Sequence, residues 1–240
     1  MDPQQPKLPD LTLFGDFQSQ PTRAIFCFLQ INKIPFKFNE ISILHKQHLS
    51  PEYRKINPTG KVPAIYDPLH DIHIFESHAI LRYLHQTRNC GDHWYPKDFK
   101  QKAKVEEYLD WHHSNLRQGA QGVFLNGYLF PLLQKRVAHD DLVNSHSILT
   151  KSLRLLETYW LADPSKKYLI TNEITIADLS AACEIAQLLP LESEILRQYP
   201  KVMKWLNQVC MIPQVKELHQ LILPQLKRLY KENQEYRAKL

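Results

Sequence analysis

The residues best suited to chemistry in this sequence begin with a serine close to the start of a predicted helix. Residues 17–23 read FQSQPTR, with Ser19 two positions before Pro21, and proline is favoured in the first turn of a helix. The free backbone N–H groups and the dipole at a helix start favour a bound negative charge. If Pro21 is the first helical residue, Gln20 caps the helix and the Ser19 hydroxyl is free to donate to an anion. The alternative is that Ser19 itself is the cap.

Two further segments carry polar groups next to predicted elements. Residues 57–63 read NPTGKVP, and a proline there belongs at the start or edge of a strand because it has no N–H to donate. A cis bond between Val62 and Pro63 would expose the backbone groups of Val62 for pairing with an extended peptide, although trans is the commoner form. Further along, Glu76 precedes Ser77, which opens a predicted helix. This pair is either an N-cap with a neighbouring acid or a second anion site.

The elements that must position these residues alternate between strands and helices in the first third of the chain. A strand–helix–strand opening predicts a parallel pair with a right-handed crossover, and the hairpin that follows adds antiparallel strands. The sequence therefore predicts a small mixed sheet with helices. The strands are predicted at 11–15, 36–43, 62–66 and 72–75, and the helices at 21–31, 51–56 and 77–87.

After a turn-rich linker the strong patterns are all helical. Thr175 and Asp178 form a capping-box signature at the start of one predicted helix, and Pro224 predicts a kink or break in the last one. The fold class is therefore α+β, with an N-terminal sheet domain and an all-α C-terminal helical bundle. The predicted helices are 100–118, 142–160, 177–189, 199–210 and 214–237. We expect an N-terminal arm at 1–9, a first domain at 10–89, a linker at 90–99 and a helical domain at 100–240.

The composition excludes several classes of function. The chain has 240 residues, 43% of them hydrophobic, and only six glycines, against about 17 expected from average usage. A glycine-rich phosphate loop is therefore not expected. The formal net charge is +5 with both signs interspersed, which argues against a nucleic-acid stripe. Twelve histidines occur without an H-E-x-x-H pattern or a second ligand cluster, so we expect no metal site.

The cysteines and the hydropathy indicate a protein of the cytoplasm. The four cysteines are far apart and form no C-x-x-C motif, which favours reduced thiols. The first ten residues contain no apolar core of a secretory signal, and no segment is long and apolar enough to span a membrane. The cysteines are Cys27, Cys90, Cys183 and Cys210.

These segments, in this order, resemble the theta class of the cytosolic glutathione transferases, from about residue 11 to 189. The family joins a thioredoxin-like domain to an all-helical domain, and the resemblance implies the same fold here. The opening serine with glutamine and proline is typical of the theta class. The matching motifs are SQPTRA (19–24), QHLSPEY (47–53), INPTGKVPAI (56–65), ESHAILRYL (76–84), DHWYP (92–96), EYLDWHHSNLR (107–117) and TIADL (175–179).

The resemblance implies a catalytic pair and a glutathione-binding set. Ser19 would donate its hydroxyl hydrogen to the glutathione sulfur, and Arg117 would lie near the sulfur and the electrophile. Within the binding set, Val62 would pair with the cysteinyl backbone ahead of a cis proline. His48 and Lys61 would hold the glycyl carboxylate. Glu76 and Ser77 would hold the γ-glutamyl amino and carboxylate groups. The implied glutathione-binding residues are His48, Leu49, Lys61, Val62, Pro63, Glu76 and Ser77.

The function implied is attack of the glutathione thiolate on a small hydrophobic electrophile, by conjugation or halide displacement, in detoxification. Glutathione is then a co-substrate, no cofactor is needed, and the family implies a homodimer, with no nucleic-acid or membrane partner. The electrophile would occupy an apolar pocket between the domains. Three alternatives stay open: a non-catalytic binding or scaffold protein, a thiol-transfer reductase, and an interaction module. The reductase would need a cysteine at the position of Ser19.

Overall fold

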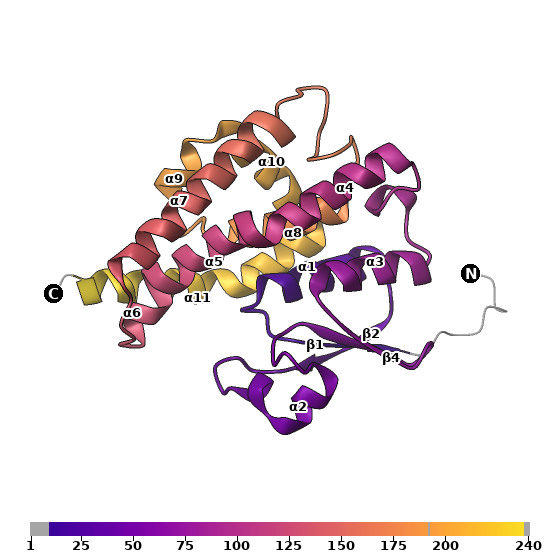
Figure 1. The fold of residues 1–240 in the computed structure, drawn as a ribbon, viewed down its shortest axis with the longest axis horizontal. Coiled ribbons are helices and arrows are strands. Elements are labelled where there is room, and N and C mark those ends of the chain that lie inside the picture. The colour runs from indigo at the N-terminus through magenta and orange to yellow at the C-terminus, as the bar shows by residue number, and fades with distance from the viewer. Residues whose placement is uncertain (1–9, 192, 238–240) are drawn as a thin grey trace. The chain divides into compact units, whose positions relative to one another are not determined.

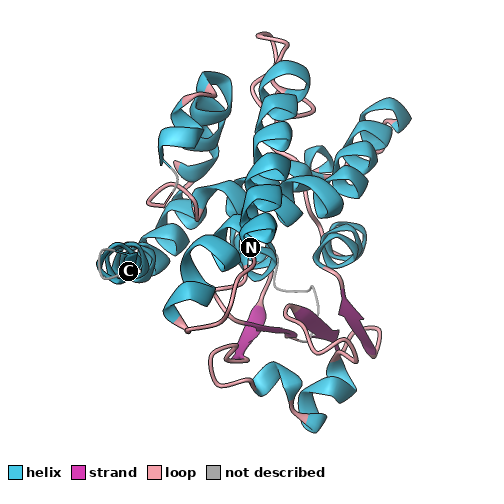
Figure 2. Cartoon of the chain, turned by 60° about the vertical axis from the view of Figure 1, so that its left-hand side comes forward, coloured by secondary structure: helices cyan, strands magenta, loops and turns pink. Residues whose placement is uncertain are grey.

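A computed structural model describes residues 10–191 and 193–237, so the predicted N-terminal arm at 1–9 lies outside the described residues. The chain divides into two compact units between Cys90 and Gly91. The first unit contains the sheet and the second is helical (Figure 2). Within the described residues, no helix combines the length and apolar character that crossing a bilayer requires.

The first unit is built on a four-stranded mixed sheet with the order β2-β1-β3-β4. β1 pairs with β2 in parallel and with β3 antiparallel, and β3 and β4 form the antiparallel hairpin. The predicted mixed sheet is therefore confirmed. The strands are β1 (Leu11–Gly15), β2 (Phe36–Glu40), β3 (Ala64–Asp67) and β4 (Ile72–Phe75).

Helices cover both faces of this sheet: α1 and α3 lie on one face and α2 on the other (Figure 1). Apolar residues of β1 and β3 and of the inner faces of α1 and α3 form a core that is fully buried, which includes Leu13, Ile65 and Leu81. α1 approaches β1 closely, since a Cβ at Gly15 would lie 2.3 Å from the Thr22 methyl group. The helices are α1 (Gln20–Ile31), α2 (Pro51–Ile56) and α3 (Ser77–Thr87), with a 3₁₀ turn η1 (Gln47–Leu49) before α2.

The second unit is helical throughout its regular structure, as predicted, but its long helices are interrupted by π-helical turns. The helices are α4 (Phe99–His112), α5 (Gln118–Phe124), α6 (Phe130–Leu132), α7 (His139–Leu155), α8 (Ile176–Ala186), α9 (Ser193–Arg197), α10 (Pro200–Cys210) and α11 (Pro213–Arg237). The π-helical turns are η3 (His113–Arg117), η4 (Leu125–Leu129) and η5 (Leu156–Trp160), and a 3₁₀ turn η2 (Asp92–Trp94) precedes α4.

α8 is the buried centre of the helical unit, since every one of its residues is buried. Its start confirms the predicted capping box: the Asp178 carboxylate accepts from the backbone N–H of Thr175 at 2.9 Å and from its hydroxyl at 2.8 Å. The same carboxylate accepts from the backbone of Leu169 and the indole of Trp205, both at 2.9 Å. Asp178 therefore connects α8 to α10 and to the chain that precedes α8.

The long last helix, α11, is attached to the second unit by a buried amide. Pro131 has no N–H to offer the carbonyl of Gly127 one helical turn earlier. The Asn233 side chain of α11 donates to that carbonyl at 3.2 Å and to the carbonyl of Tyr128 at 3.4 Å. α11 also runs through Pro224 without interruption. A break at Pro224 is therefore wrong, whereas a kink there stays a prediction. Pro224 is exposed, so water can solvate the carbonyl that it leaves unpaired.

Candidate functional site

The sheet register brings three polar segments to one end of the strands. Ala64 pairs with Phe14 on one side and with Phe75 on the other. Because β3 is antiparallel to both neighbours, the chain before Ala64 lies beside the chain that follows β1 and the chain that follows β4. These segments contain Ser19, the Val62–Pro63 pair and the Glu76–Ser77 pair. The topology therefore assembles most of the residues predicted for the site.

Ser19 lies at the start of α1 and is its N-cap. Its backbone is extended (φ −82°, ψ 119°), Gln20 is the first helical residue and Pro21 the second. The expectation that Gln20 caps the helix is therefore wrong, because the first helical turn accommodates Pro21 one position later than assumed. The Ser19 oxygen accepts from Thr22 N at 3.4 Å and donates to the Val62 carbonyl at 3.4 Å. Both contacts are long for hydrogen bonds of these types.

The turn before Ser19 is held by residues that the sequence analysis missed. Asp16 is buried, and its carboxylate accepts from Gln18 N and from Ile43 N, each at 2.8 Å. The buried Arg23 donates to the carbonyl of Phe17 at 2.7 Å. An aspartate followed two residues later by a free N–H is the signal of an Asx turn. A buried arginine in the first turn of an apolar helix is a second usable signal.

The Val62–Pro63 peptide bond is cis, as the family resemblance implies. The preceding carbonyl, that of Lys61, accepts from the Tyr53 hydroxyl at 2.7 Å and from the Asn57 amide at 2.6 Å. Burial raises the pKa of Tyr53 to about 12, although the hydrogen bond with Asn57 lowers it. The phenol therefore stays protonated as a donor, and the segment before β3 is held in one position.

His48 and Leu49 lie in the turn η1, next to the loop that leads to Lys61. Gly60 has a positive φ of 62°, and a Cβ there would lie 3.2 Å from the His48 carbonyl. Within the described chain, the buried Nδ1 of His48 has no hydrogen-bond partner. The Leu49 side chain is 46% exposed and Lys61 is exposed. One imidazole nitrogen and one ammonium group are thus available on neighbouring loops.

Glu76 and Ser77 form the junction between β4 and α3. Glu76 occupies the N-cap position with a φ of 70° and makes no capping hydrogen bond through its side chain. The alternative in which Ser77 is the cap is therefore wrong, because Ser77 is already the first helical residue. A non-glycine residue at positive φ is strained, and such residues gather at functional sites. Within this junction Glu76 is exposed and Ser77 is 8% exposed.

The helix α3 also resembles α1 in its electrostatics. Neither helix has an acidic residue in its first turn, although the N-cap of α3 is the acidic Glu76. The positive end of the α1 dipole therefore has no carboxylate in its cap or first turn. An anion held at the adjoining strand ends would experience both dipoles.

Arg117 belongs to the helical unit, where it ends the π-helical turn η3. Its guanidinium forms an ion pair with Glu184 of α8, whose side chain is 2% exposed. The buried His112 lies with its Nε2 3.9 Å from the same carboxylate. Sequence reasoning missed Glu184, although an acidic residue in an otherwise apolar helix is a signal of a buried ion pair.

All four cysteines lie within the described residues, and none of them forms a disulfide there. Cys27, in the middle of α1, is fully buried. Burial raises the pKa of Cys90 to about 11 and that of Cys210 to about 12. Such thiols carry little thiolate near neutral pH and are poor nucleophiles.

Both halves of the chain match models of a known family. Residues 9–86 match the glutathione S-transferase N-terminal domain, and residues 140–213 match its C-terminal domain. The chain is 42% identical to glutathione S-transferase T1 of Arabidopsis thaliana over 219 residues, which covers 88% of this chain and 89% of that protein. The chain belongs to the theta class of the glutathione S-transferase family. This confirms the recognition made from the motifs.

Two further relatives agree with the theta class. Glutathione S-transferase T2 of Arabidopsis thaliana is 40% identical to this chain. The match covers 93% of this chain but only 39% of T2, which is a longer protein. A crystal structure of human glutathione transferase theta-2, in complex with glutathione, is similar with a TM-score of 0.83 and 33% identity, covering 92% of this chain and 91% of that one. The expected thioredoxin-like and helical domains of the family fold are thereby confirmed.

Proposed function

We propose that this transferase ionises bound glutathione through the Ser19 hydroxyl and conjugates the thiolate to a small hydrophobic electrophile or displaces halide from it. Membership of the theta class supports the reaction. The role of Ser19 is supported by one observation above all: its hydroxyl stands at the start of α1 with only two long contacts, each of 3.4 Å. A hydroxyl held so loosely can turn toward a stronger acceptor.

The energy required is within reach of this arrangement. Lowering the pKa of a thiol from about 8.5 by about two units needs roughly 2.7 kcal/mol of preferential thiolate stabilisation. A hydrogen bond to a charged group contributes about 1.5–3 kcal/mol, and the helix dipole adds about 0.3–1 kcal/mol. Ser19 acts as a donor and keeps its own proton, so the carbonyl of Val62 gives up a weak contact when the thiolate arrives.

The other predicted residues hold the tripeptide. Val62 offers its backbone ahead of the cis proline, and the γ-glutamyl end would lie at the start of α3. The glycyl carboxylate would lie between the two loops that carry the available imidazole and ammonium groups. Arg117, already paired with Glu184, would approach the sulfur and the electrophile. The proposed glutathione-binding residues are His48, Leu49, Lys61, Val62, Pro63, Glu76 and Ser77.

The test is the ionisation of bound glutathione in a Ser19→Ala variant. In the native chain we expect the ultraviolet absorbance of the thiolate to titrate about two pH units below free glutathione. In the variant the midpoint should return to about 8.5, and kcat/KM should fall about 30–100-fold, which corresponds to about 2–2.7 kcal/mol. The affinity for S-methylglutathione, which has no thiol to ionise, should change little.

The matched control is Thr87→Ala, because this hydroxyl lies at the far end of α3 and donates to the Tyr83 carbonyl of its own helix. It should leave the midpoint and kcat/KM unchanged. If the Ser19→Ala variant keeps the native midpoint of thiolate titration, the proposed donation by the Ser19 hydroxyl is wrong. A chain that binds S-methylglutathione but never shows a thiolate signal is instead the non-catalytic alternative.

We also propose that the protein acts in the cytoplasm as a homodimer. Static light scattering on a size-exclusion column should give twice the 28.3 kDa chain mass. A mass that stays at one chain over a range of concentrations contradicts this assembly.

A further inference from the structure

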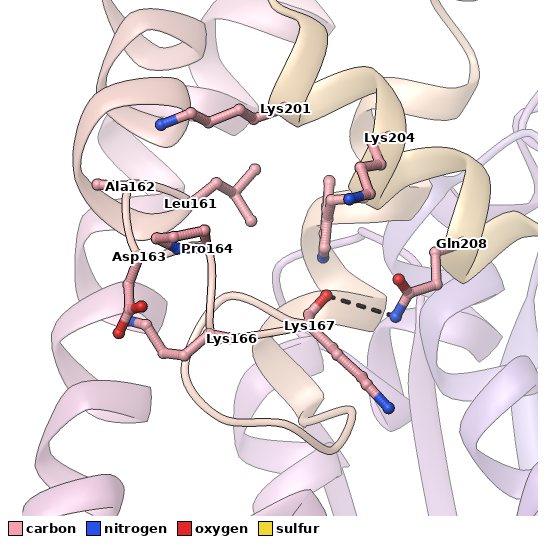
Figure 3. Close-up of a pocket in the computed structure, with 10 residues that line it drawn as sticks. Leu161, Ala162, Asp163, Pro164, Lys166, Lys167, Lys201, Lys204 and Gln208 are labelled. Atoms are coloured by element: carbon pink, nitrogen blue, oxygen red, sulfur yellow. Dashed lines mark hydrogen bonds between the residues drawn. The ribbon is translucent and has the colours of Figure 1, made fainter.

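A cavity of about 460 Å³ lies in the helical unit and contains none of the residues proposed for glutathione. One wall is the connection that follows η5, and the other is α10 (Figure 3). We call this space the lysine cavity. It is lined by Leu161, Ala162, Asp163, Pro164, Lys166, Lys167, Lys201, Lys204, Trp205 and Gln208.

The lining is unbalanced in charge, with four ammonium groups against one carboxylate. Within the described residues, no carboxylate lies within ion-pair distance of any of the four lysines. Asp163 is engaged in its own turn, where it accepts from the hydroxyl and backbone N–H of Ser165 at 2.7 and 2.9 Å. Lys166 lies beside that carboxylate, whereas the side chains of Lys167, Lys201 and Lys204 extend away from it (Figure 3).

A second acid, at the start of α10, is also engaged. Glu157 accepts from the backbone N–H groups of Lys201 and Val202 at 3.1 and 2.9 Å, and so caps the start of α10. Glu157 thus satisfies the helix start, and among the described residues it forms no ion pair with Lys201 or Lys204. Lys167, Lys201 and Lys204 thus line a space whose lining in the described chain contains no carboxylate except that of Asp163.

The walls that carry these charges are fixed. Trp205 is 2% exposed, and its indole donates to Asp178, which anchors α10 to α8. The Gln208 amide donates to the carbonyl of Lys167 at 3.4 Å and joins the two walls (Figure 3). Lys201 and Lys204 are three residues apart and therefore share one face of α10. The side chains of Lys167 and Lys201 point away from each other (Figure 3), so these flexible chains must turn inward to converge on a ligand.

From these observations we propose that the lysine cavity binds a phosphate monoester with a flat apolar body. Ammonium groups on flexible stems bind a phosphate as point charges. Leu161, Pro164 and Trp205 supply apolar atoms to the lining of the cavity. A volume of about 460 Å³ lies within the roughly 300–1,000 Å³ common for small-molecule sites. A purely inorganic anion would leave that apolar surface in contact with water.

The test uses 1-naphthyl phosphate and its two halves, inorganic phosphate and 1-naphthol. Each is titrated calorimetrically into the full chain saturated with S-hexylglutathione, which occupies the proposed catalytic site. We expect one 1-naphthyl phosphate per chain, an affinity about tenfold above that of either half, and weaker binding as salt is raised. The Trp205 indole N–H resonance should shift during the titration.

The decisive variant is Lys201→Gln with Lys204→Gln, and its control is Lys216→Gln with Lys227→Gln, two exposed lysines of α11 outside the cavity. Both double variants remove the same charge from the surface. The first should weaken 1-naphthyl phosphate about tenfold or more, and the second less than twofold. Conjugation of glutathione should be unchanged in both.

Three results overturn the proposal. The first is the absence of 1-naphthyl phosphate binding to the saturated native chain at millimolar concentration. The second is equal weakening in the two double variants, which shows a general effect of net charge. The third is a Trp205 resonance that stays in place while the ligand binds, which shows that the ligand occupies another site.

Discussion

Two helix starts in this protein use a hydroxyl in opposite ways. At α8 the Thr175 hydroxyl donates to Asp178 at 2.8 Å, in a position with no exposure to solvent. At α1 the Ser19 hydroxyl has two contacts of 3.4 Å and is 7% exposed. The Thr175 hydroxyl therefore has a structural role. The Ser19 hydroxyl is positioned by its backbone, but its hydrogen can be donated to another acceptor.

The difference extends to the groups around each hydroxyl. At α8 one carboxylate receives four hydrogen bonds and joins three parts of the helical unit. At α1 the supporting bonds, from Asp16 and Arg23, go to the backbone and leave the hydroxyl itself alone. Support of the backbone without engagement of the side chain is the pattern expected of a preorganised functional group. Mutations at the two helix starts should therefore separate stability from activity.

The largest effect should follow Asp178→Ala. This change leaves the buried N–H groups of Leu169, Thr175 and Trp205 without an acceptor, and each such group costs about 1–3 kcal/mol. We expect the free energy of unfolding, measured in urea, to fall by about 3–5 kcal/mol.

The control for that change is Asp110→Ala, an exposed aspartate on α4. Its effect should stay within about 0.5 kcal/mol. If the two variants lose similar stability, the capping network does not hold the helical unit together as described here.

A smaller effect should distinguish the two hydroxyls themselves. Thr175→Ala should lower the free energy of unfolding by about 1–2 kcal/mol, as for a well-formed cap, and Ser19→Ala by about 0.5 kcal/mol. Conjugation should show the reverse order, with Thr175→Ala retaining kcat/KM and Ser19→Ala losing it. Equal stability losses would remove the contrast between a structural and a functional hydroxyl.

Much of the fold was predictable because local signals agreed. Periodicity placed the strands and helices of the first unit, and the Thr175–Asp178 spacing located the start of α8. The resemblance added the cis bond at Pro63 and the class of reaction, neither of which follows from residue patterns alone. The cap of α1 was misplaced by one residue, because proline fits both the first and the second helical position.

What escaped prediction depends on contacts between distant parts of the chain. Glu184 forms an ion pair with Arg117, which lies 67 positions earlier in the sequence. A local sequence pattern cannot predict a pair so far apart. β2 ends at Glu40, before the predicted residue 43, because Ile43 N is bonded to Asp16 of a different segment. The π-helical turns η3 and η5 lie within the helices predicted at 100–118 and 142–160, because they preserve the apolar stripe of those helices. No helix was predicted over η4, which lies between these two segments.

The smallest effect concerns pH and compares two aspartates that are both fully buried, Asp67 in the first unit and Asp178 in the second. Burial favours a higher pKa for Asp67, but hydrogen bonds from Tyr83, the Leu69 backbone and Arg88, with the charge of Arg88, lower it below 3.8. Asp178 has four donors but none that carries a positive charge, and burial raises its pKa above 3.8. The two carboxyls should therefore respond to acid with opposite signs.

A lowered folded-state pKa gives stability that is present above the unfolded value of 3.8 and is lost as the pH falls through the folded pKa. A raised folded-state pKa makes the folded chain bind the proton more tightly, so stability is gained as the pH falls through the folded pKa toward 3.8. Urea unfolding of the native chain, Asp67→Asn and Asp178→Asn is measured at several pH values between about 6 and about 3. The difference in free energy of unfolding between the native chain and Asp67→Asn should shrink at the acid end. The corresponding difference between the native chain and Asp178→Asn should grow toward pH 4. Curves that move in the same direction for both variants would show that the guanidinium of Arg88 does not set the difference between the two sites.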